Sequence, residues 1–309
     1  MLFGWKEATP VPLPFLFIIR LTLEQMKKIK NIIVPTDFSA TSRNAYHYAV
    51  RLAETLDATV TVVHINEYFI PVSEIAIAPL SEQEESRLTE AMSLFIADED
   101  ASDEGIMVKN KVKTRIIKGD PISRLVELSE SGDADLIVMG TTGLQDFLSK
   151  IIGSTSLDVS NKAHCPVLLV PRDSKWHRVD KVMFASNYDS TTPKTIREVT
   201  DFALSVGAAV HFVHIEDFST ESENKVSEII WDELFSLTDP NLSFEIHTIS
   251  GSDKIAELKK YAAEHGINLM AFVSKHRTFW GNLMHKSVTQ NIAISTSTPM
   301  LVMHLDDAI

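Results

Sequence analysis

The sequence predicts an α/β protein made of two tandem open sheets, each with five parallel strands and with helices on both faces. Two observations predict this class. Apolar strand-like runs alternate with helical apolar stripes from residue 30 onward, and the whole alternation occurs a second time about 150 residues later. Because parallel strands require crossover connections, alternating strands and helices form a parallel sheet that is covered on both faces.

In the first copy, the residue types indicate each element. Residues 58–65 are rich in β-branched side chains, as strands buried in parallel sheets are. Residues 39–56 place their apolar side chains on one helical stripe. Asp120 and Pro121 form a helix start, a cap residue followed by proline at the first position. Strands are therefore predicted at 31–35, 58–65, 111–119, 135–140 and 165–171, and helices at 39–56, 81–98 and 121–132.

A duplication accounts for the second copy. Residues 180–217 align without a gap with residues 30–67, at a shift of 150, and residues 268–303 align with residues 135–170, at a shift of 133. The second copy therefore lacks 17 residues in its middle connection. Each copy has an ordinary domain size. We divide the chain into an N-terminal extension (1–28), a first domain (29–172) and a second domain (178–305).

The N-terminal extension fits neither copy. Its apolar run from Phe15 to Ile19 is too short to cross a bilayer, and three prolines precede it. One interpretation is a weak anchor at a membrane surface. The interpretation that we favour is a flexible extension, with Met26 opening the folded part.

The charge balance excludes two classes of partner. The formal net charge is −13 and the isoelectric point about 5.3. The basic surface that nucleic acids require is therefore missing, and an anionic membrane would repel the chain. The single cysteine, Cys165, precludes an internal disulfide and fits a reducing cytoplasm. We expect a cytoplasmic protein that binds neither nucleic acid nor membrane, with Cys165 as a small buried apolar side chain.

A glycine-rich stretch follows the fourth strand. Gly140 stands at the carboxyl end of that strand, where open parallel sheets bind ligands, and a glycine there lets a ligand approach the main chain. Gly153, Ser154 and Thr155 open the next helix, whose free N–H groups and dipole favour phosphate. A nucleotide would fit this arrangement, but turn glycines without any ligand account for the spacing equally well.

The spacing Gly140-x2-Gly143-x9-Gly153-Ser154 resembles the nucleotide-binding signature of the universal stress protein family. The runs IIVPTDFS, VVHINE and NKAHCPVLLVP resemble that family's first strand, its second strand, and its closing helix with the fifth strand. Both copies follow this plan from residue 30 onward, as in a tandem member of the family. The resemblance implies the strand order 3-2-1-4-5 in each sheet and ATP or AMP as the ligand.

The resemblance also implies the residues of the site. Asp37 would accept hydrogen bonds from ribose hydroxyls or the base, and the main chain at Ile65 would meet the adenine. N–H and hydroxyl donors of the glycine-rich stretch would hold the phosphates, with Mg²⁺ accompanying them. No catalytic residue and no separate metal site is implied. The implied cofactor-binding residues are Pro35, Thr36, Asp37, Ile65, Met139, Gly140, Gly143, Gly153, Ser154 and Thr155.

The second copy departs from this pattern, because Asp37 corresponds to Asn187, Gly140 to Val273 and Gly153 to Lys286. Valine and lysine at positions of close approach are expected to fill the groove. We therefore predict that the first copy binds nucleotide and the second does not; the alternative is that both have lost the ligand. The second copy is expected to act as a built-in dimer partner, with the apolar runs CPVLLV and TPMLVM paired across a pseudo-two-fold axis. A homodimer of whole chains is a further alternative.

Three functions are compatible with these residues. The first is a cytoplasmic stress-response regulatory protein that binds ATP or AMP and acts on an unidentified protein partner. The second is an enzyme of slow ATP hydrolysis or adenylyl chemistry, although the sequence offers no convincing general base or arginine finger. The third is a nucleotide-free scaffold that acts through dimer surfaces.

Two histidines of the second copy are spaced like metal ligands. His211 and His214 lie three residues apart, but positions three apart on a strand face opposite sides of the sheet. We predict that they, like His64, are hydrogen-bonded to the main chain of the sheet rather than to zinc.

Overall fold

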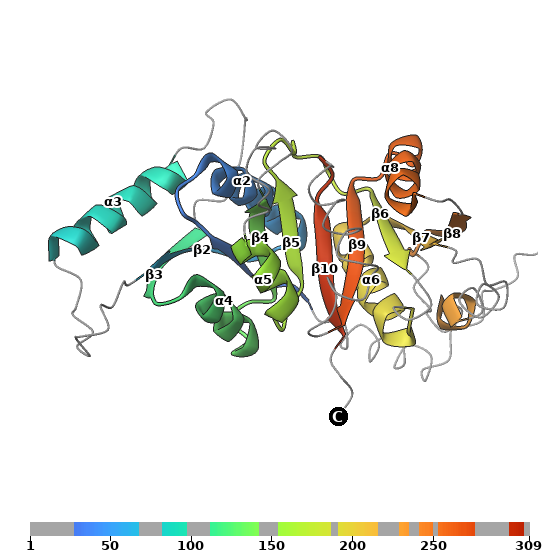
Figure 1. The fold of residues 1–309 in the computed structure, drawn as a ribbon, viewed down its shortest axis with the longest axis horizontal. Helices are drawn as coiled ribbons and strands as arrows, with labels where there is room; N and C mark the ends of the chain where they lie inside the picture. Colours follow the sequence, from blue (N-terminus) through green and yellow to red (C-terminus); the bar gives the residue numbers. More distant parts are fainter. Residues whose placement is uncertain are drawn as a thin grey trace, which may run out of the picture.

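A single ten-stranded sheet runs through the molecule, with helices on both faces (Figure 1). The computed structural model describes residues 28–67, 82–97, 112–141, 154–186, 191–215, 229–234, 241–249, 253–275 and 297–305. The strands are β1 (Asn31–Pro35), β2 (Thr59–Asn66), β3 (Val112–Lys118), β4 (Leu136–Thr141), β5 (Val167–Pro171), β6 (Lys181–Ser186), β7 (Ala209–Ile215), β8 (Phe244–Ile249), β9 (Leu269–Lys275) and β10 (Met300–Leu305). The helices are α2 (Ala40–Leu56), α3 (Glu82–Ala97), α4 (Pro121–Glu130), α5 (Ser154–Lys162), α6 (Pro193–Val206) and α8 (Lys254–His265).

The strand order repeats itself. From edge to edge it is β3-β2-β1-β4-β5-β10-β9-β6-β7-β8. The first half, β1 to β5, thus has the order 3-2-1-4-5. The second half, β6 to β10, has the same order when it is read from the opposite edge of the sheet. Every pairing within a half is parallel. The predicted fold class is confirmed.

The two halves join through their last strands. β5 and β10 are antiparallel neighbours, and Leu168 lies opposite Leu301. These two leucines are also repeat equivalents at the shift of 133, so the pseudo-two-fold axis passes between them. The expected pairing of CPVLLV with TPMLVM is therefore confirmed. It merges the two five-stranded sheets into one.

Two apolar cores lie on opposite faces of this sheet. One face is covered by α2, α3 and α6, and the other by α4, α5 and α8. The core under α2 and α6 is continuous across the junction, because it contains Leu168 and Leu301 together with side chains from both helices. Cys165 is buried in the other core, as predicted.

Helix α3 has only a narrow contact with the sheet. Its acidic first turn is exposed, as expected for a solvated helix start, while Met92 and Phe95 are buried. Within the described ranges, no helix combines the length and the apolar character needed to cross a bilayer. The N-terminal stretch 1–27 lies outside the described residues.

The equivalent helices α2 and α6 begin at different points of the repeat. Ser39 caps α2 by accepting a hydrogen bond from the Ser42 N–H. Thr192 caps α6, and it corresponds to Ser42 at the shift of 150. The second helix therefore starts three residues later than the first. The residues of the second half that correspond to the first turn of α2 thus precede α6.

We expect Thr192→Ala to destabilise the protein. The Thr192 hydroxyl accepts from the Thr195 N–H at 3.2 Å, and the Thr192 N–H donates to the Thr195 hydroxyl at 2.9 Å, which forms a capping box. Losing such a cap costs about 1 kcal/mol of unfolding free energy, which urea denaturation can measure. Thr192→Ser retains the hydroxyl and is the control. Equal stability of the alanine and serine variants would contradict the cap.

Candidate functional site

A pocket of about 410 Å³ lies at the carboxyl ends of β1, β2 and β4. This is the point where the strand order reverses between β1 and β4, the usual ligand position of open parallel sheets. Its volume is within the range of small-molecule sites. Seven of the ten implied cofactor-binding residues line it: Pro35, Thr36, Asp37, Ile65, Met139, Gly140 and Thr155.

The remaining three implied residues belong to the glycine-rich stretch. Gly143 and Gly153 lie outside the described residues. Ser154 is the first residue of α5, whose amino end faces the pocket through Thr155 and Ser156. A helix start at this place brings free N–H groups and the positive end of the helix dipole to the pocket.

The loop after β1 is held by hydroxyl groups. Thr36 continues the β1–β2 pairing, because its N–H donates to the Val63 carbonyl at 2.9 Å. Its hydroxyl lies 3.1 Å from the Ser42 hydroxyl and accepts from the Phe38 N–H at 2.9 Å. Phe38 has a φ of 64°, a left-handed conformation that this bond helps to hold. The loop thereby turns sharply into α2 and exposes Asp37 to the pocket.

Asp37 is arranged as a carboxylate acceptor. Its Oδ1 accepts from the Ser39 N–H at 3.0 Å. Partial burial raises the pKa of Asp37, but hydrogen bonds from Ser39 and from the Ser42 hydroxyl outweigh this effect and hold the pKa below its ordinary value. Asp37 is therefore ionised at neutral pH and has lone pairs left for a ligand.

The lowered pKa of Asp37 predicts a pH effect on stability. The unfolded chain, with an ordinary pKa near 3.8, takes up this proton before the folded chain does. The stabilisation from Asp37 is therefore complete above about pH 4 and is lost as the pH falls through the folded pKa. In urea denaturation from pH 6 down to pH 2.5, Asp37→Asn is expected to lose less stability on acidification than the wild type. Asp232→Asn, at an exposed site of the second half, is the control; an unchanged acid slope in Asp37→Asn would contradict the prediction.

The end of β2 supplies an imidazole, an apolar side chain and a carboxylate. His64 Nδ1 lies 2.9 Å from the Thr36 carbonyl, so this histidine is bonded to the main chain as predicted. Its ring also lies 4.6 Å from the Phe38 ring, which fixes its orientation at the pocket wall. Ile65 and Glu67 complete this side of the pocket.

Packing against α2 explains the glycine at the end of β4. A Cβ atom on Gly140 would lie 2.5 Å from the Thr41 carbonyl oxygen and 2.8 Å from the Thr41 carbonyl carbon. These are main-chain atoms of the first turn of α2, which no rotamer change can move aside. Glycine at position 140 therefore leaves room for the first turn of α2. This close packing lets α2 close over the pocket.

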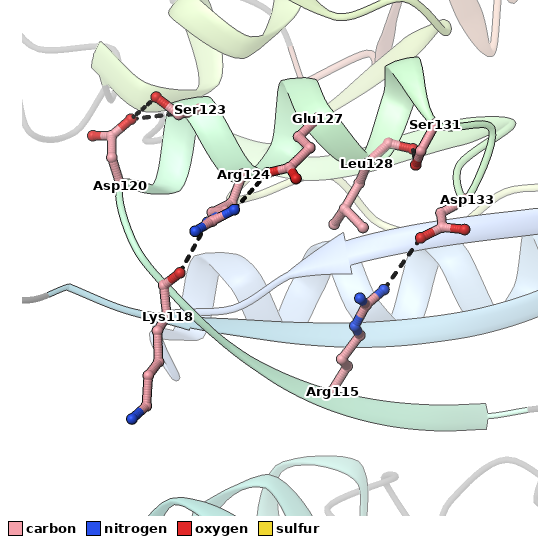
Figure 2. A network of polar contacts seen from close by, with 9 residues as sticks. All are labelled: Arg115, Lys118, Asp120, Ser123, Arg124, Glu127, Leu128, Ser131 and Asp133. Atoms are coloured by element: carbon pink, nitrogen blue, oxygen red, sulfur yellow. Dashed lines mark hydrogen bonds and ion pairs between the residues drawn. The ribbon is translucent and has the colours of Figure 1, made fainter. Parts of the chain in front are cut away.

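The start of α4 forms the opposite rim, where Pro121 and Leu125 line the pocket. Figure 2 shows how this helix start is fixed. The Asp120 carboxylate accepts from the Ser123 N–H at 2.8 Å, as the predicted cap requires. Arg124 donates to the Lys118 carbonyl and pairs with Glu127, so its guanidinium holds the turn together rather than a ligand (Figure 2).

Several pocket residues were not predicted from the sequence. Pro121 and Leu125 belong to the helix after the third strand, whose distance from β1 the sequence does not give. Glu67 could have been found, because it directly follows the second strand. The lining residues missed by the prediction are Ser39, Thr41, Ser42, Val63, His64, Glu67, Pro121, Leu125 and Ser156.

In the second half, two positions that correspond to pocket residues of the first half are buried. Ala185 and Val273, the equivalents of Pro35 and Gly140, are buried, with exposed fractions of 7% and 4%. Asn187, His276 and Lys286, the other substituted positions, lie outside the described residues. The closure of this groove stays a prediction.

Three comparisons relate the chain to known proteins. The model of the universal stress protein family matches residues 28–171. A universal stress protein of Methanocaldococcus jannaschii is 31% identical over 153 residues, which cover 47% of this chain and 84% of the relative. One from Mycobacterium tuberculosis is 28% identical over 146 residues, covering 47% of this chain and 98% of the relative. A solved universal stress protein from Archaeoglobus fulgidus has a TM-score of 0.65 at 16% identity over 89% of this chain and 98% of its own, a likeness of fold across both halves.

Proposed function

The chain belongs to the universal stress protein family, and on this premise we propose that its first half binds an adenine nucleotide, ATP or AMP, in the pocket at the carboxyl ends of β1, β2 and β4. Asp37 accepts hydrogen bonds from the ribose or the base. The main chain at Ile65 meets the adenine edge, and Met139 and Gly140 flank the ribose.

The phosphates of the nucleotide lie at the start of α5 in this proposal. Ser154 and Thr155 supply hydroxyl and N–H donors, and the family signature assigns Gly143 and Gly153 to the same phosphates. Mg²⁺ enters with the phosphates rather than at a site of its own.

One observation carries the proposal: residues from four separate elements, named by the family signature, line the same pocket. Apolar side chains such as Ile65, Met139 and Leu125 suit a flat base, and the ionised Asp37 suits hydroxyl donors. The helix start at Thr155 suits an anion in an otherwise acidic chain.

The second half has a different role in this proposal. It is a separate domain, residues 178–305, that replaces the second subunit of a dimer and binds no nucleotide. The protein is a cytoplasmic regulator, and nucleotide occupancy of the first domain, residues 29–172, sets its interaction with another protein.

Titration of the full chain tests the proposal. ATP, ADP and AMP are added separately, with and without Mg²⁺, and affinity is measured by calorimetry and by thermal shift. A nucleotide at 100 times its Kd adds about 2.7 kcal/mol of stability. Asp37→Ala is expected to weaken binding at least tenfold, while Asp232→Ala, which removes an exposed carboxylate of the second half, leaves it unchanged.

Two other outcomes would replace the proposal. No response to millimolar nucleotide would favour the nucleotide-free scaffold. Rapid release of phosphate or pyrophosphate from ATP would favour the enzyme, and it would call for a general base in the pocket.

A further inference from the structure

Three side chains that ligate metals meet at the far edge of the second half. His211 on β7 and Glu245 and His247 on β8 form this group, called here the His–Glu cluster. His247 Nε2 lies 2.8 Å from Glu245 Oε2, and His211 Nδ1 lies 3.9 Å from the same oxygen. One ligand atom from each residue lies within 4.8 Å of the others.

Strand register brings these residues to one face. His211 lies opposite Glu245, and His247 lies opposite Val213, two residues further along β7. Residues two apart on a strand share a face, so all three side chains point toward α8. His214 is not among them, in agreement with the expectation that His211 and His214 face opposite sides.

Helix α8 closes over the cluster with two polar aromatic side chains. The Tyr261 hydroxyl lies 2.8 Å from His211 Nδ1, and the ring of His265 lies 5.5 Å from that of His247. The expected main-chain bond of His211 was thus wrong, because this ring nitrogen contacts a side chain.

The three side chains of the His–Glu cluster differ in their exposure to solvent. The side chain of His211 is 2% exposed, whereas those of His247 and Glu245 are 34% and 56% exposed. An ion can therefore arrive from solvent through Glu245 and His247 and meet a rigid imidazole behind them. Lys181, a nearby cation, is held by the His265 carbonyl, to which its ammonium donates at 3.0 Å.

The first half has no such group at the same place. In the register of β2 and β3, the positions of His211, Glu245 and His247 correspond to Thr61, Lys113 and Arg115. There Arg115 pairs with Asp133 at 3.3 Å (Figure 2). Two cations would repel a metal ion, so the fold itself does not require the His–Glu cluster.

We propose that the His–Glu cluster binds a zinc ion. Two imidazole nitrogens and one carboxylate oxygen are a donor set that suits Zn²⁺, with a water in the fourth position. Zinc bonds of 2.0–2.2 Å in tetrahedral geometry require ligand atoms roughly 3.4 Å apart. The present separations bracket that value, so small side-chain rotations suffice. Binding at His211 Nδ1 would exchange its hydrogen bond to Tyr261 for a metal bond.

The ion would connect the edge strand β8 to its neighbour β7 through side chains of both strands. An edge strand has one free row of main-chain groups and only one neighbour to hold it. A zinc ion that joins His211 to both β8 ligands adds a second connection across this pair. The second half then gains a ligand of its own, chemically unlike that of the first half.

Zinc titration of the full chain tests the site. The affinity for Zn²⁺ is measured by competition with a chromophoric chelator, and Co²⁺ is added separately as a spectroscopic probe. Glu245→Gln and His247→Gln are the test variants, because both side chains are partly exposed and their loss should leave the fold intact by circular dichroism. Glu130→Gln and His177→Gln are the controls, since each removes an exposed residue of the same type elsewhere.

We expect one tight equivalent of Zn²⁺, weakened at least tenfold in both test variants and unchanged in both controls. Co²⁺ should give the visible absorption of a four-coordinate ion in the wild type only, and Zn²⁺ should raise the melting temperature by a few degrees in the wild type only. Wild-type zinc affinity in folded Glu245→Gln and His247→Gln, or no zinc binding by the wild type at micromolar concentration, would overturn the proposal.

Discussion

Gly140→Val is expected to lower the free energy of unfolding by about 1–3 kcal/mol and to weaken nucleotide binding at least tenfold. The added Cβ would lie 2.5 Å from the Thr41 carbonyl oxygen, so either the end of β4 or the first turn of α2 must shift. That turn carries Thr41 and Ser42, which line the pocket. Stability and affinity should therefore fall together, as urea denaturation and calorimetry would measure.

The second half offers a matched control for Gly140→Val. Val273 occupies the equivalent position and is buried, and α6 begins three residues later than α2, at Pro193. Val273→Gly should therefore destabilise the protein through lost packing while leaving nucleotide affinity as in the wild type. If Gly140→Val kept both wild-type stability and wild-type affinity, the close contact with Thr41 would not be a real constraint.

The contrast between Gly140 and Val273 shows which part of the site a sequence can predict. Strand ends are predictable, since apolar runs give the strands and the carboxyl ends of parallel strands meet. Which residues of that edge belong to the site came from the family resemblance, and Asp37, Ile65 and Thr155, which it implied, all line the pocket. The reason for Gly140 was not predictable, because its contact with Thr41 depends on where a helix starts in space.

The His–Glu cluster was missed for a related reason. His211 lies 34 residues from Glu245 and 36 from His247 in sequence, and it meets them only through the register of β7 and β8. The sequence does not show which residue of FEIHTI lies opposite His211. β3 corresponds to β8 at a shift of 132, whereas α4 corresponds to α8 at a shift of 133. An alignment of the two copies made from the helices would therefore place every side chain of β8 on the wrong face.

The junction between the halves was predictable because both of its strands are apolar on both faces and follow a proline. Such strands are buried, and the last strand of each copy has one edge left to pair. The sequence did not show that the two sheets share one continuous core. That follows from α2 and α6, which lie on the same face and pack on the leucines of both strands.

Leu168→Ala and Leu301→Ala are expected to cost about 2–5 kcal/mol each, and to cost nearly the same. Both leucines are fully buried, face the same core and lie opposite each other across the pseudo-two-fold axis. Because the two leucines are in contact range, their effects should not be additive. The loss of unfolding free energy in the double variant should differ from the sum of the losses in the two single variants. Urea denaturation of the three variants measures these differences.

A shared core also predicts the shape of the unfolding curve. If α2 and α6 pack on one apolar layer, losing either leucine weakens both halves, and unfolding stays a single transition followed alike by tryptophan fluorescence and circular dichroism. Leu94→Ala, on an exposed leucine of α3, is the control and should change stability by less than about 0.5 kcal/mol. Two separated transitions, or costs for Leu168→Ala and Leu301→Ala as small as that of Leu94→Ala, would mean that the halves fold as independent units that merely touch.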